Sequence, residues 1–262
     1  MTNHWPVIGP RSMPNAVDAI VLCGGAGLRL KSVTGDAPKS LAYIGERPFL
    51  AILLNQLQRY GSDRVILAVG YQKELIHSQF GDQAHGLKIG YSIESTPLGT
   101  GGALRNALSQ MEANCALIMN GDSYTDADLR LFSICHQNTN ADVSVLVVPA
   151  NGRTDCGLVS VDSDGRILGF REKQSASGKQ YVNAGIYVVN KQILDEIPTG
   201  IQVSLEAELF PQWLGESKHL RAFHYPGQCI DIGTPDRYRE AQVTLANVEA
   251  RDVLAECERQ KV

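Results

Sequence analysis

The feature that most constrains the fold is a short apolar segment that runs directly into closely spaced glycines. Residues 17–23 (VDAIVLC) are mostly apolar, which is typical of a strand buried on both faces of a parallel sheet. Gly24, Gly25 and Gly27 follow immediately. Because glycines after a strand let backbone N–H groups converge, such a loop is suited to holding an anion. The chain therefore begins like an α/β protein with a phosphate-binding turn.

Strand and helix patterns alternate through the first half of the chain. This repetition predicts a Rossmann-like α/β fold, in which a mostly parallel central sheet carries helices on both faces and the crossovers are right-handed. The expected strands are 17–23, 64–69, 87–93 and 116–119, and the expected helices begin at Pro48, Gln72 and Gly99.

The second half of the chain is richer in strands. An Asp-Ser-Asp-Gly sequence at 162–165 predicts a tight turn between two of them. Ser204 could cap a short helix that reaches Leu214, and the chain reads as helical from Thr234 onward. We expect this half to form a smaller β-rich lobe. Its expected strands are 143–149, 157–162, 166–172, 181–190 and 220–225.

Composition excludes several classes of protein. The net charge is −4 and no run of Lys or Arg suggests a nucleic-acid-binding stripe. No apolar run approaches the roughly 18 residues of a membrane span, and residues 1–15 hold no run of signal-peptide length. The six cysteines are widely spaced without a CxxC pair, which favours structural thiols over a zinc site. We therefore expect an intracellular, cytoplasmic protein that binds neither nucleic acid nor membrane.

Two basic residues follow the glycine loop at positions suited to a polyphosphate. Arg29 and Lys39 would add positive charge to an anion that lies on the loop. A dinucleotide fingerprint that starts at Gly25 requires glycine at position 30, which is Leu30, and the spacing of a P-loop is also absent. A flexible glycine-rich turn beside two surface cations is the alternative interpretation.

At this point the residues resemble a family. Gly24-Gly25-x-Gly27-x-Arg29-Leu30 with Pro38-Lys39 is similar to the signature of the sugar-1-phosphate nucleotidyltransferases, also called nucleotide-sugar pyrophosphorylases. The resemblance implies a GT-A-like fold and the transfer of a nucleotidyl group from a nucleoside triphosphate to a sugar 1-phosphate, with release of pyrophosphate. Four later segments fit the order of the family's motifs and extend the resemblance over residues 16–240: 94–103 (ESTPLGTGGA), 120–122 (NGD), 170–173 (FREK) with 183–187 (NAGIY), and 231–235 (DIGTP).

The resemblance also suggests a domain organisation. No linker-like stretch divides the chain, so we expect a single catalytic domain over residues 16–249. The helix after Thr234 could pack internally or against a second copy, which leaves a homo-oligomer open. The expected parts are a flexible arm (1–15), a nucleotide-binding half (16–140), a sugar-phosphate-binding half (141–233), a C-terminal helix (234–249) and a helical or frayed tail (250–262).

The implied reaction needs no protein nucleophile. A phosphate oxygen attacks, and it is already ionised at pH 7 because the second phosphate pKa is about 6. The protein must hold two polyanions in line and neutralise their repulsion, a task for Mg²⁺ and basic side chains. By resemblance, Asp122 and Asp231 are the carboxylates that bind Mg²⁺; the alternative is that each aspartate only caps a turn. The expected catalytic residues are Arg29, Lys39, Asp122, Lys173 and Asp231.

The resemblance places the sugar contacts in the second half. Lys173 matches the family lysine that holds the sugar phosphate, and Glu172 beside it would contact sugar hydroxyls. Asn183 and Glu206 match further sugar contacts, and Gly157 would allow the backbone to approach the sugar closely. For Glu206 the alternative is a solvated helix face.

Glu94 bears on the choice of nucleotide. It precedes the Pro97-Leu98-Gly99 segment, which in this family reads the base edge. A carboxylate can accept both the N1–H and the exocyclic amine of guanine, while uracil and thymine offer one N–H each. The pattern favours GTP without excluding UTP or dTTP, and a surface charge at a strand end is the alternative. The expected nucleotide-binding residues are Leu22, Gly24, Gly25, Gly27, Glu94, Gly99 and Thr100.

Within the family, residues 91–102 and 230–235 are similar to heptose 1-phosphate guanylyltransferases. This similarity implies GMP transfer from GTP to D-glycero-α-D-manno-heptose 1-phosphate, which gives GDP-heptose. Three positions depart from wider family usage: Leu28 replaces the usual threonine, Ser40 a common proline and Cys229 a frequent aromatic residue. The alternatives are a mannose-1-phosphate guanylyltransferase, a uridylyltransferase for another sugar 1-phosphate, and a non-catalytic regulator that binds a nucleotide without releasing pyrophosphate.

Overall fold

The computed structural model describes residues 17–25, 27–150, 157–171 and 181–246. The expected N-terminal arm and tail, the last residues of the C-terminal helix, and both Glu172 and Lys173 lie outside these ranges. Within the described part, no helix is long and apolar enough to cross a membrane.

Four parallel strands form the centre of the sheet. β1 (Val17–Leu22) pairs with β4 (Arg64–Val69) on one side and with β7 (Cys115–Asn120) on the other, and β6 (Leu87–Ile93) extends the order beyond β4. β1, β4 and β7 are rich in β-branched and apolar residues and mostly buried, because helices cover both of their faces, whereas β6 nearer the edge alternates buried with exposed residues. Their carboxyl ends therefore meet at one edge of the sheet.

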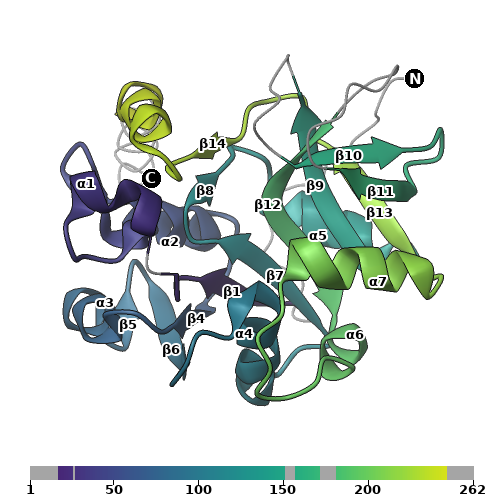
Figure 1. Cartoon of the computed structure of the whole chain (residues 1–262), viewed down its shortest axis with the longest axis horizontal. Coiled ribbons are helices and arrows are strands. Elements are labelled where there is room, and N and C mark those ends of the chain that lie inside the picture. Colours follow the sequence, from purple (N-terminus) through teal and green to yellow (C-terminus); the bar gives the residue numbers. More distant parts are fainter. Residues whose placement is uncertain (1–16, 26, 151–156, 172–180, 247–262) are drawn as a thin grey trace, which may run out of the picture.

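The strands of the second half continue the same sheet. β12 (Tyr181–Asn190) lies antiparallel to β7, and it connects to four further strands (Figure 1). The fold is thus the expected α/β fold, with a parallel core that the β-rich part extends. The added strands are β9 (Val143–Pro149), β10 (Leu158–Val161), β11 (Ile167–Arg171) and β13 (Leu220–His224), and the short β5 (Gln83–Ala84) closes the other end.

Helices divide between the two faces of this sheet because the side chains of each strand alternate. In β1, Ala19 and Val21 belong to one core cluster and Ile20 to the other. The first cluster is completed by α2 (Phe49–Arg59), α3 (Lys73–Phe80), α5 (Leu129–Gln137) and the C-terminal helix (235–246). The second is completed by α4 (Gly99–Ala107), α6 (Lys191–Asp195) and α7 (Phe210–Gly215).

Some helices differ in their ends or their conformation from what the sequence pattern predicts. The helix expected from Gly99 leaves the α conformation after Ala107 and ends in a 3₁₀ turn at Leu108–Gln110. Ser204 does cap a helix: its hydroxyl accepts the N–H of Ala207 at the start of a π-helical turn (Leu205–Leu209) that leads into α7. Sequence analysis missed α5, although Asp128 caps it by accepting the N–H of Leu131.

Two small sheets lie at the carboxyl edge of the parallel strands. β8 (Ser123–Tyr124) pairs with β14 (Ile230–Asp231). This pairing connects the segment just after β7 with the segment just before the C-terminal helix. β2 (Tyr43–Ile44) and β3 (Arg47–Pro48) form a hairpin that the same helix holds, because Gln242 donates to the carbonyl of Tyr43 and accepts from the N–H of Gly45. The C-terminal helix therefore braces the segments that surround this edge (Figure 1).

Candidate active site

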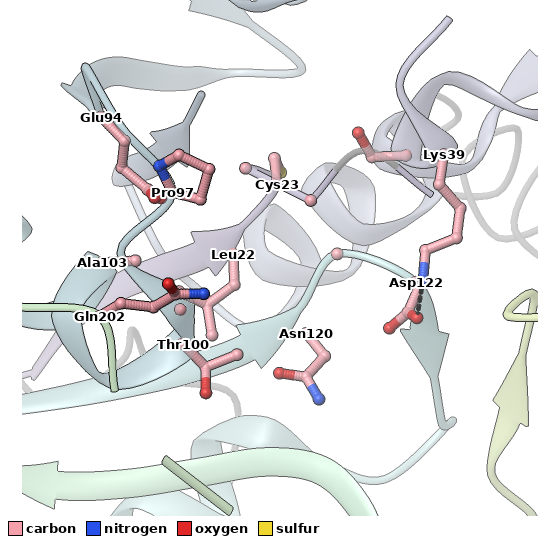
Figure 2. A pocket seen from close by; sticks show the side chains of 15 residues that line it. Leu22, Cys23, Lys39, Glu94, Pro97, Thr100, Ala103, Asn120, Asp122 and Gln202 are labelled. Carbon is pink, nitrogen blue, oxygen red and sulfur yellow. Dashed lines mark hydrogen bonds and ion pairs between the residues drawn. The ribbon is translucent and has the colours of Figure 1, made fainter. Parts of the chain in front are cut away.

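A cavity of about 330 Å³ opens at the carboxyl ends of β1 and β7. Figure 2 shows Glu94 and Pro97 at one end of it and the Lys39–Asp122 pair at the other, with Thr100 and Asn120 between them. It is lined by Leu22, Cys23, Gly24, Gly25, Lys39, Ser40, Glu94, Pro97, Gly99, Thr100, Ala103, Asn120, Gly121, Asp122 and Gln202. Most of the predicted nucleotide-binding residues are thus brought together.

The glycine loop is shaped by close approaches that a side chain would block. A Cβ atom on Gly24 would lie 2.6 Å from Oε1 of Glu94. Gly27 has a φ of +59°, and a Cβ there would lie 2.8 Å from Cβ of Lys39. Gly27 does not line the cavity, but it lets the chain turn back so that Lys39 reaches it. Gly24 and Gly27 therefore each have a steric reason to be glycine, whereas a Cβ on Gly25 would meet no atom within 4 Å.

Lys39 and Asp122 form a partly buried ion pair at the end of the cavity opposite Glu94. Lys39 begins a 3₁₀ turn (Lys39–Leu41), and Asp122 follows β7 within the Asn120-Gly121-Asp122 motif. Gly121 is required there, because a Cβ on it would lie 2.6 Å from the carbonyl oxygen of Leu22. The pair gives this end of the cavity one acidic and one basic group.

Asp231 lies beside Asp122 on the neighbouring strand. The β8–β14 register places Asp231 opposite Ser123, and the N–H of Ile232 donates to the carbonyl of Asp122 at 3.0 Å. The Asp231 carboxylate accepts the N–H of Gly233 at 3.0 Å and a guanidinium N–H of Arg237 at 2.7 Å. Two carboxylates on paired strands match the donor set of a Mg²⁺ ion that also binds phosphate oxygens and water.

No larger metal cluster competes with this pair: the described residues hold no group of three or more His, Cys, Asp or Glu that could bind a metal ion. Arg29 and Asp231 line a neighbouring cavity of about 610 Å³ rather than the one in Figure 2. Arg237, which sequence analysis did not single out, lines it too. Of the predicted catalytic residues that the structure describes, Lys39 and Asp122 line one cavity and Arg29 and Asp231 the other, with the Asp122–Asp231 contact between them.

Glu94 is half-buried and held in one orientation. Its Oε2 accepts the N–H of Leu98 at 2.9 Å, while its Oε1 lies against Gly24. Burial raises the pKa of this carboxyl above its usual value, and the bond from Leu98 opposes that rise. A half-buried, oriented carboxylate on the wall of a cavity is suited to reading hydrogen-bond donors, so the position does not support a mere surface charge.

Thr100 and Glu206 contact each other across the two halves of the chain. The Thr100 hydroxyl donates to Oε2 of Glu206 at 2.8 Å and accepts the N–H of Leu205 at 2.7 Å. Thr100 lines the cavity, but its hydroxyl faces the protein rather than a ligand. Glu206 is not on a solvated helix face either, because Tyr187 donates to its other oxygen at 3.0 Å.

The remaining predicted sugar contacts lie near this pair. Asn183 donates to the Tyr187 hydroxyl at 2.9 Å, and its backbone N–H donates to the carbonyl of Gly157 at 3.2 Å. Gly157 is exposed, and none of the described atoms lies within 4 Å of an added Cβ there. Sequence analysis missed Asn120, Tyr187 and Gln202; the first two lie inside motifs it quoted, and Gln202 carries no local signal.

Comparison with known proteins settles the family. A nucleotidyl transferase family profile matches residues 18–248, nearly the whole chain. The chain belongs to the nucleotidyl transferase family. The resemblance that the glycine loop and the later motifs suggested is therefore confirmed.

Individual members of this family are similar to the chain over most of its length. The chain is 37% identical over 229 residues to a D-glycero-alpha-D-manno-heptose 1-phosphate guanylyltransferase of Aneurinibacillus thermoaerophilus, covering 87% of this chain and 98% of that protein. It is 36% identical to a mannose-1-phosphate guanylyltransferase of Mycobacterium tuberculosis, covering 87% of this chain but 64% of that protein. A crystal structure of HddC from Yersinia pseudotuberculosis complexed with GMP-PN matches with a TM-score of 0.77 and 31% identity, covering 87% of this chain and 99% of that one.

Proposed function

We propose that this protein transfers GMP from GTP to D-glycero-α-D-manno-heptose 1-phosphate, with Mg²⁺, and releases pyrophosphate and GDP-heptose. The observation that carries the proposal is the carboxylate of Glu94, oriented by the Leu98 N–H at the end of the cavity opposite Lys39 and Asp122. A nucleotide laid along this cavity has its base at Glu94 and its phosphates at the Lys39–Asp122 end.

Guanine fits the Glu94 end by its hydrogen-bond pattern. Its N1–H and exocyclic amine point the same way, and a carboxylate accepts both. Because Oε2 is already engaged with Leu98, the group is preorganised before a base arrives. The guanylyltransferase names of the two relatives, and GMP-PN in the HddC complex, support the same choice.

The phosphate end supplies positive charge and N–H donors. Lys39 reaches this end from the 3₁₀ turn after the glycine loop, and Gly25 of that loop exposes its backbone in the cavity wall. Arg29 extends the positive charge into the adjoining cavity, where the departing pyrophosphate or the sugar phosphate would gather. These groups hold the attacking and leaving oxygens in line and stabilise negative charge on the phosphorus centre.

Asp122 and Asp231 would hold the Mg²⁺ ion. Bound there, the ion would neutralise charge on the transferred phosphate. The Asp122 carboxylate accepts from Lys39, and the Asp231 carboxylate accepts from Arg237 and Gly233, so each is oriented by a donor. The sugar 1-phosphate itself supplies the nucleophilic oxygen, and no described side chain is needed as a base.

Heptose 1-phosphate is the first candidate, because the heptose relative is 37% identical to the chain over 229 residues. The chain covers 98% of the heptose enzyme but only 64% of the mannose enzyme, although the identities are nearly equal. Mannose 1-phosphate is the second candidate because of that 36% identity.

The test is pyrophosphate release with Mg²⁺, measured for GTP, UTP, CTP, dTTP and ATP with heptose 1-phosphate, and then with mannose 1-phosphate. Release with GTP and heptose 1-phosphate alone supports the full proposal. If mannose 1-phosphate is preferred, the proposed sugar is wrong but the proposed reaction type holds. Preference for UTP overturns the role of Glu94 in reading guanine. If no pair of substrates releases pyrophosphate, the proposed catalytic activity is overturned.

A further inference from the structure

A buried tyrosine connects two of the residues that the family resemblance assigns to the sugar. The hydroxyl of Tyr187 accepts a hydrogen bond from Nδ2 of Asn183 at 2.9 Å and donates one to Oε1 of Glu206 at 3.0 Å. The side chain is fully buried, and its ring packs edge-on against Phe210 with centroids 5.2 Å apart. Tyr187 therefore touches both residues from behind, where no substrate can reach it.

An irregularity in β12 makes this contact possible. Residues four apart in a regular strand are separated by about 13 Å, too far for Asn183 and Tyr187 to bond. The register between β12 and β9 shifts between these two residues. Gly185 lies within the shift at a φ of +72°, and its N–H donates to Oδ1 of Asn183 at 2.9 Å. The bulge thus folds Asn183 back onto Tyr187.

The hydrogen bonds of Glu206 leave room for a ligand. A carboxylate offers about four acceptor directions. Two are filled by short bonds, from Tyr187 at 3.0 Å and from Thr100 at 2.8 Å. The other two contacts, from Asn120 and Ser204, are long at 3.5 Å. A sugar hydroxyl can replace the long contacts while the short ones keep the carboxylate in place.

We infer that Tyr187 is a positioning residue that fixes Asn183 and Glu206 for recognition of a sugar hydroxyl. The inference rests on the proposed function, because both partners are assigned to the sugar by the family resemblance. Thr100 holds the second oxygen of Glu206 from α4, so the carboxylate is clamped between the two halves of the chain. Sugar binding thereby depends on a tyrosine that never touches the sugar.

The test is Tyr187→Phe, which keeps the ring against Phe210 and removes only the hydroxyl. Steady-state kinetics are measured with each substrate varied in turn. We expect the KM for the sugar 1-phosphate to rise about tenfold, as for loss of a hydrogen bond to a charged group, and the KM for GTP to stay within about twofold. Tyr91→Phe is the matched control: it also loses a tyrosine hydroxyl bond, to the carbonyl of Gly81 at 2.6 Å, away from the sugar residues.

A second measurement separates positioning from general loosening. Sugar 1-phosphates that lack one ring hydroxyl each are compared in the wild type and in Tyr187→Phe. We expect one deoxygenation to weaken binding about tenfold in the wild type and far less in the variant, because the carboxylate that reads that hydroxyl is no longer fixed. Deoxygenation penalties that are equal in both proteins overturn the inference.

The outcomes distinguish this inference from the proposed function. A wild-type protein that releases no pyrophosphate with any sugar 1-phosphate overturns both. An active wild type whose Tyr187→Phe variant behaves like Tyr91→Phe overturns the positioning role alone. If Tyr187→Phe does not fold, Thr100→Val removes the other short bond to Glu206; we expect the same sugar-specific rise in KM, and an unchanged value overturns the inference.

Discussion

The nucleotide end and the sugar end of the site are built in different ways. The nucleotide end joins two short segments, a glycine loop directly after β1 and the end of β6, and within the second the contact is local: the Glu94 carboxylate lies four residues before the Leu98 N–H that orients it. The sugar end joins residues from α4, β12 and the π-helical turn, and a strand bulge is needed to bring Asn183 to Tyr187. Local geometry specifies the first, and long-range packing specifies the second.

The largest effect is expected at the boundary between the two ends. Asp122→Asn should lower kcat by about a thousandfold or more, because it removes a charge that the phosphate chemistry needs and leaves Lys39 without its ionic partner. Pyrophosphate release measures this. Asp162→Asn, in the exposed turn before β11, is the matched control, and comparable losses in both variants would mean that Asp122 acts only through folding.

The next largest effect is expected when the charge of Glu94 at the nucleotide end is removed. Glu94→Gln keeps the size of the side chain but replaces one acceptor by a donor, so it should reduce kcat/KM for GTP by about a hundredfold. The loss for UTP should be smaller, since uracil offers a single N–H. Competition between GTP and UTP measures the ratio. An unchanged preference for GTP would remove Glu94 from base recognition.

A smaller effect tests the same end by shape. Gly24→Ala places a methyl group 2.6 Å from Oε1 of Glu94, so the carboxylate must shift, and we expect the KM for GTP to rise about tenfold while that for the sugar 1-phosphate holds. Gly169→Ala is the control, because nothing lies within 4 Å of the added carbon. Equal KM values in both variants would show that the close approach is unimportant.

The smallest effect concerns stability at the far end of β12. His136 is buried, with its ring nitrogens 2.7 Å from the Ser144 hydroxyl and 3.1 Å from Oδ1 of Asn190. Burial lowers its pKa, so the unfolded chain takes up a proton more readily than the folded protein. The contribution of neutral His136 to the free energy of unfolding is fully present above the usual histidine pKa of about 6.5, and it falls as the pH drops below that value.

Thermal unfolding between pH 5 and pH 8 measures this loss. We expect the Tm to fall by a few degrees below pH 6.5, and a His136→Gln variant to show a flatter profile over the same range. An identical pH dependence in the two proteins would assign the effect to other groups.

Sequence patterns identified the fold well where neighbours in the chain determine it. The strands Arg64–Val69, Leu87–Ile93 and Val143–Pro149 occur as expected, because long apolar runs bounded by turns admit few other structures. α5 was missed because its apolar residues are interspersed with Arg130, Cys135 and His136, and its cap, Asp128, follows another aspartate in a polar loop. Propensity alone is a weak guide in such a stretch.

For the site, the sequence by itself indicated the glycine loop, Asp122 and Glu94, because each follows a strand end whose position in the sheet follows from the βαβ order, and it indicated Lys39 through the Pro38-Lys39 motif. Only the tertiary structure showed that Asp231 lies beside Asp122 on a paired strand, and that Tyr187 and Thr100 hold Glu206. The physical reason is that the residues in contact are far apart in the sequence. The hydrogen bonds to Glu206 span 19 residues from Tyr187 and 106 from Thr100, and they depend on tertiary packing that no local pattern of residues encodes.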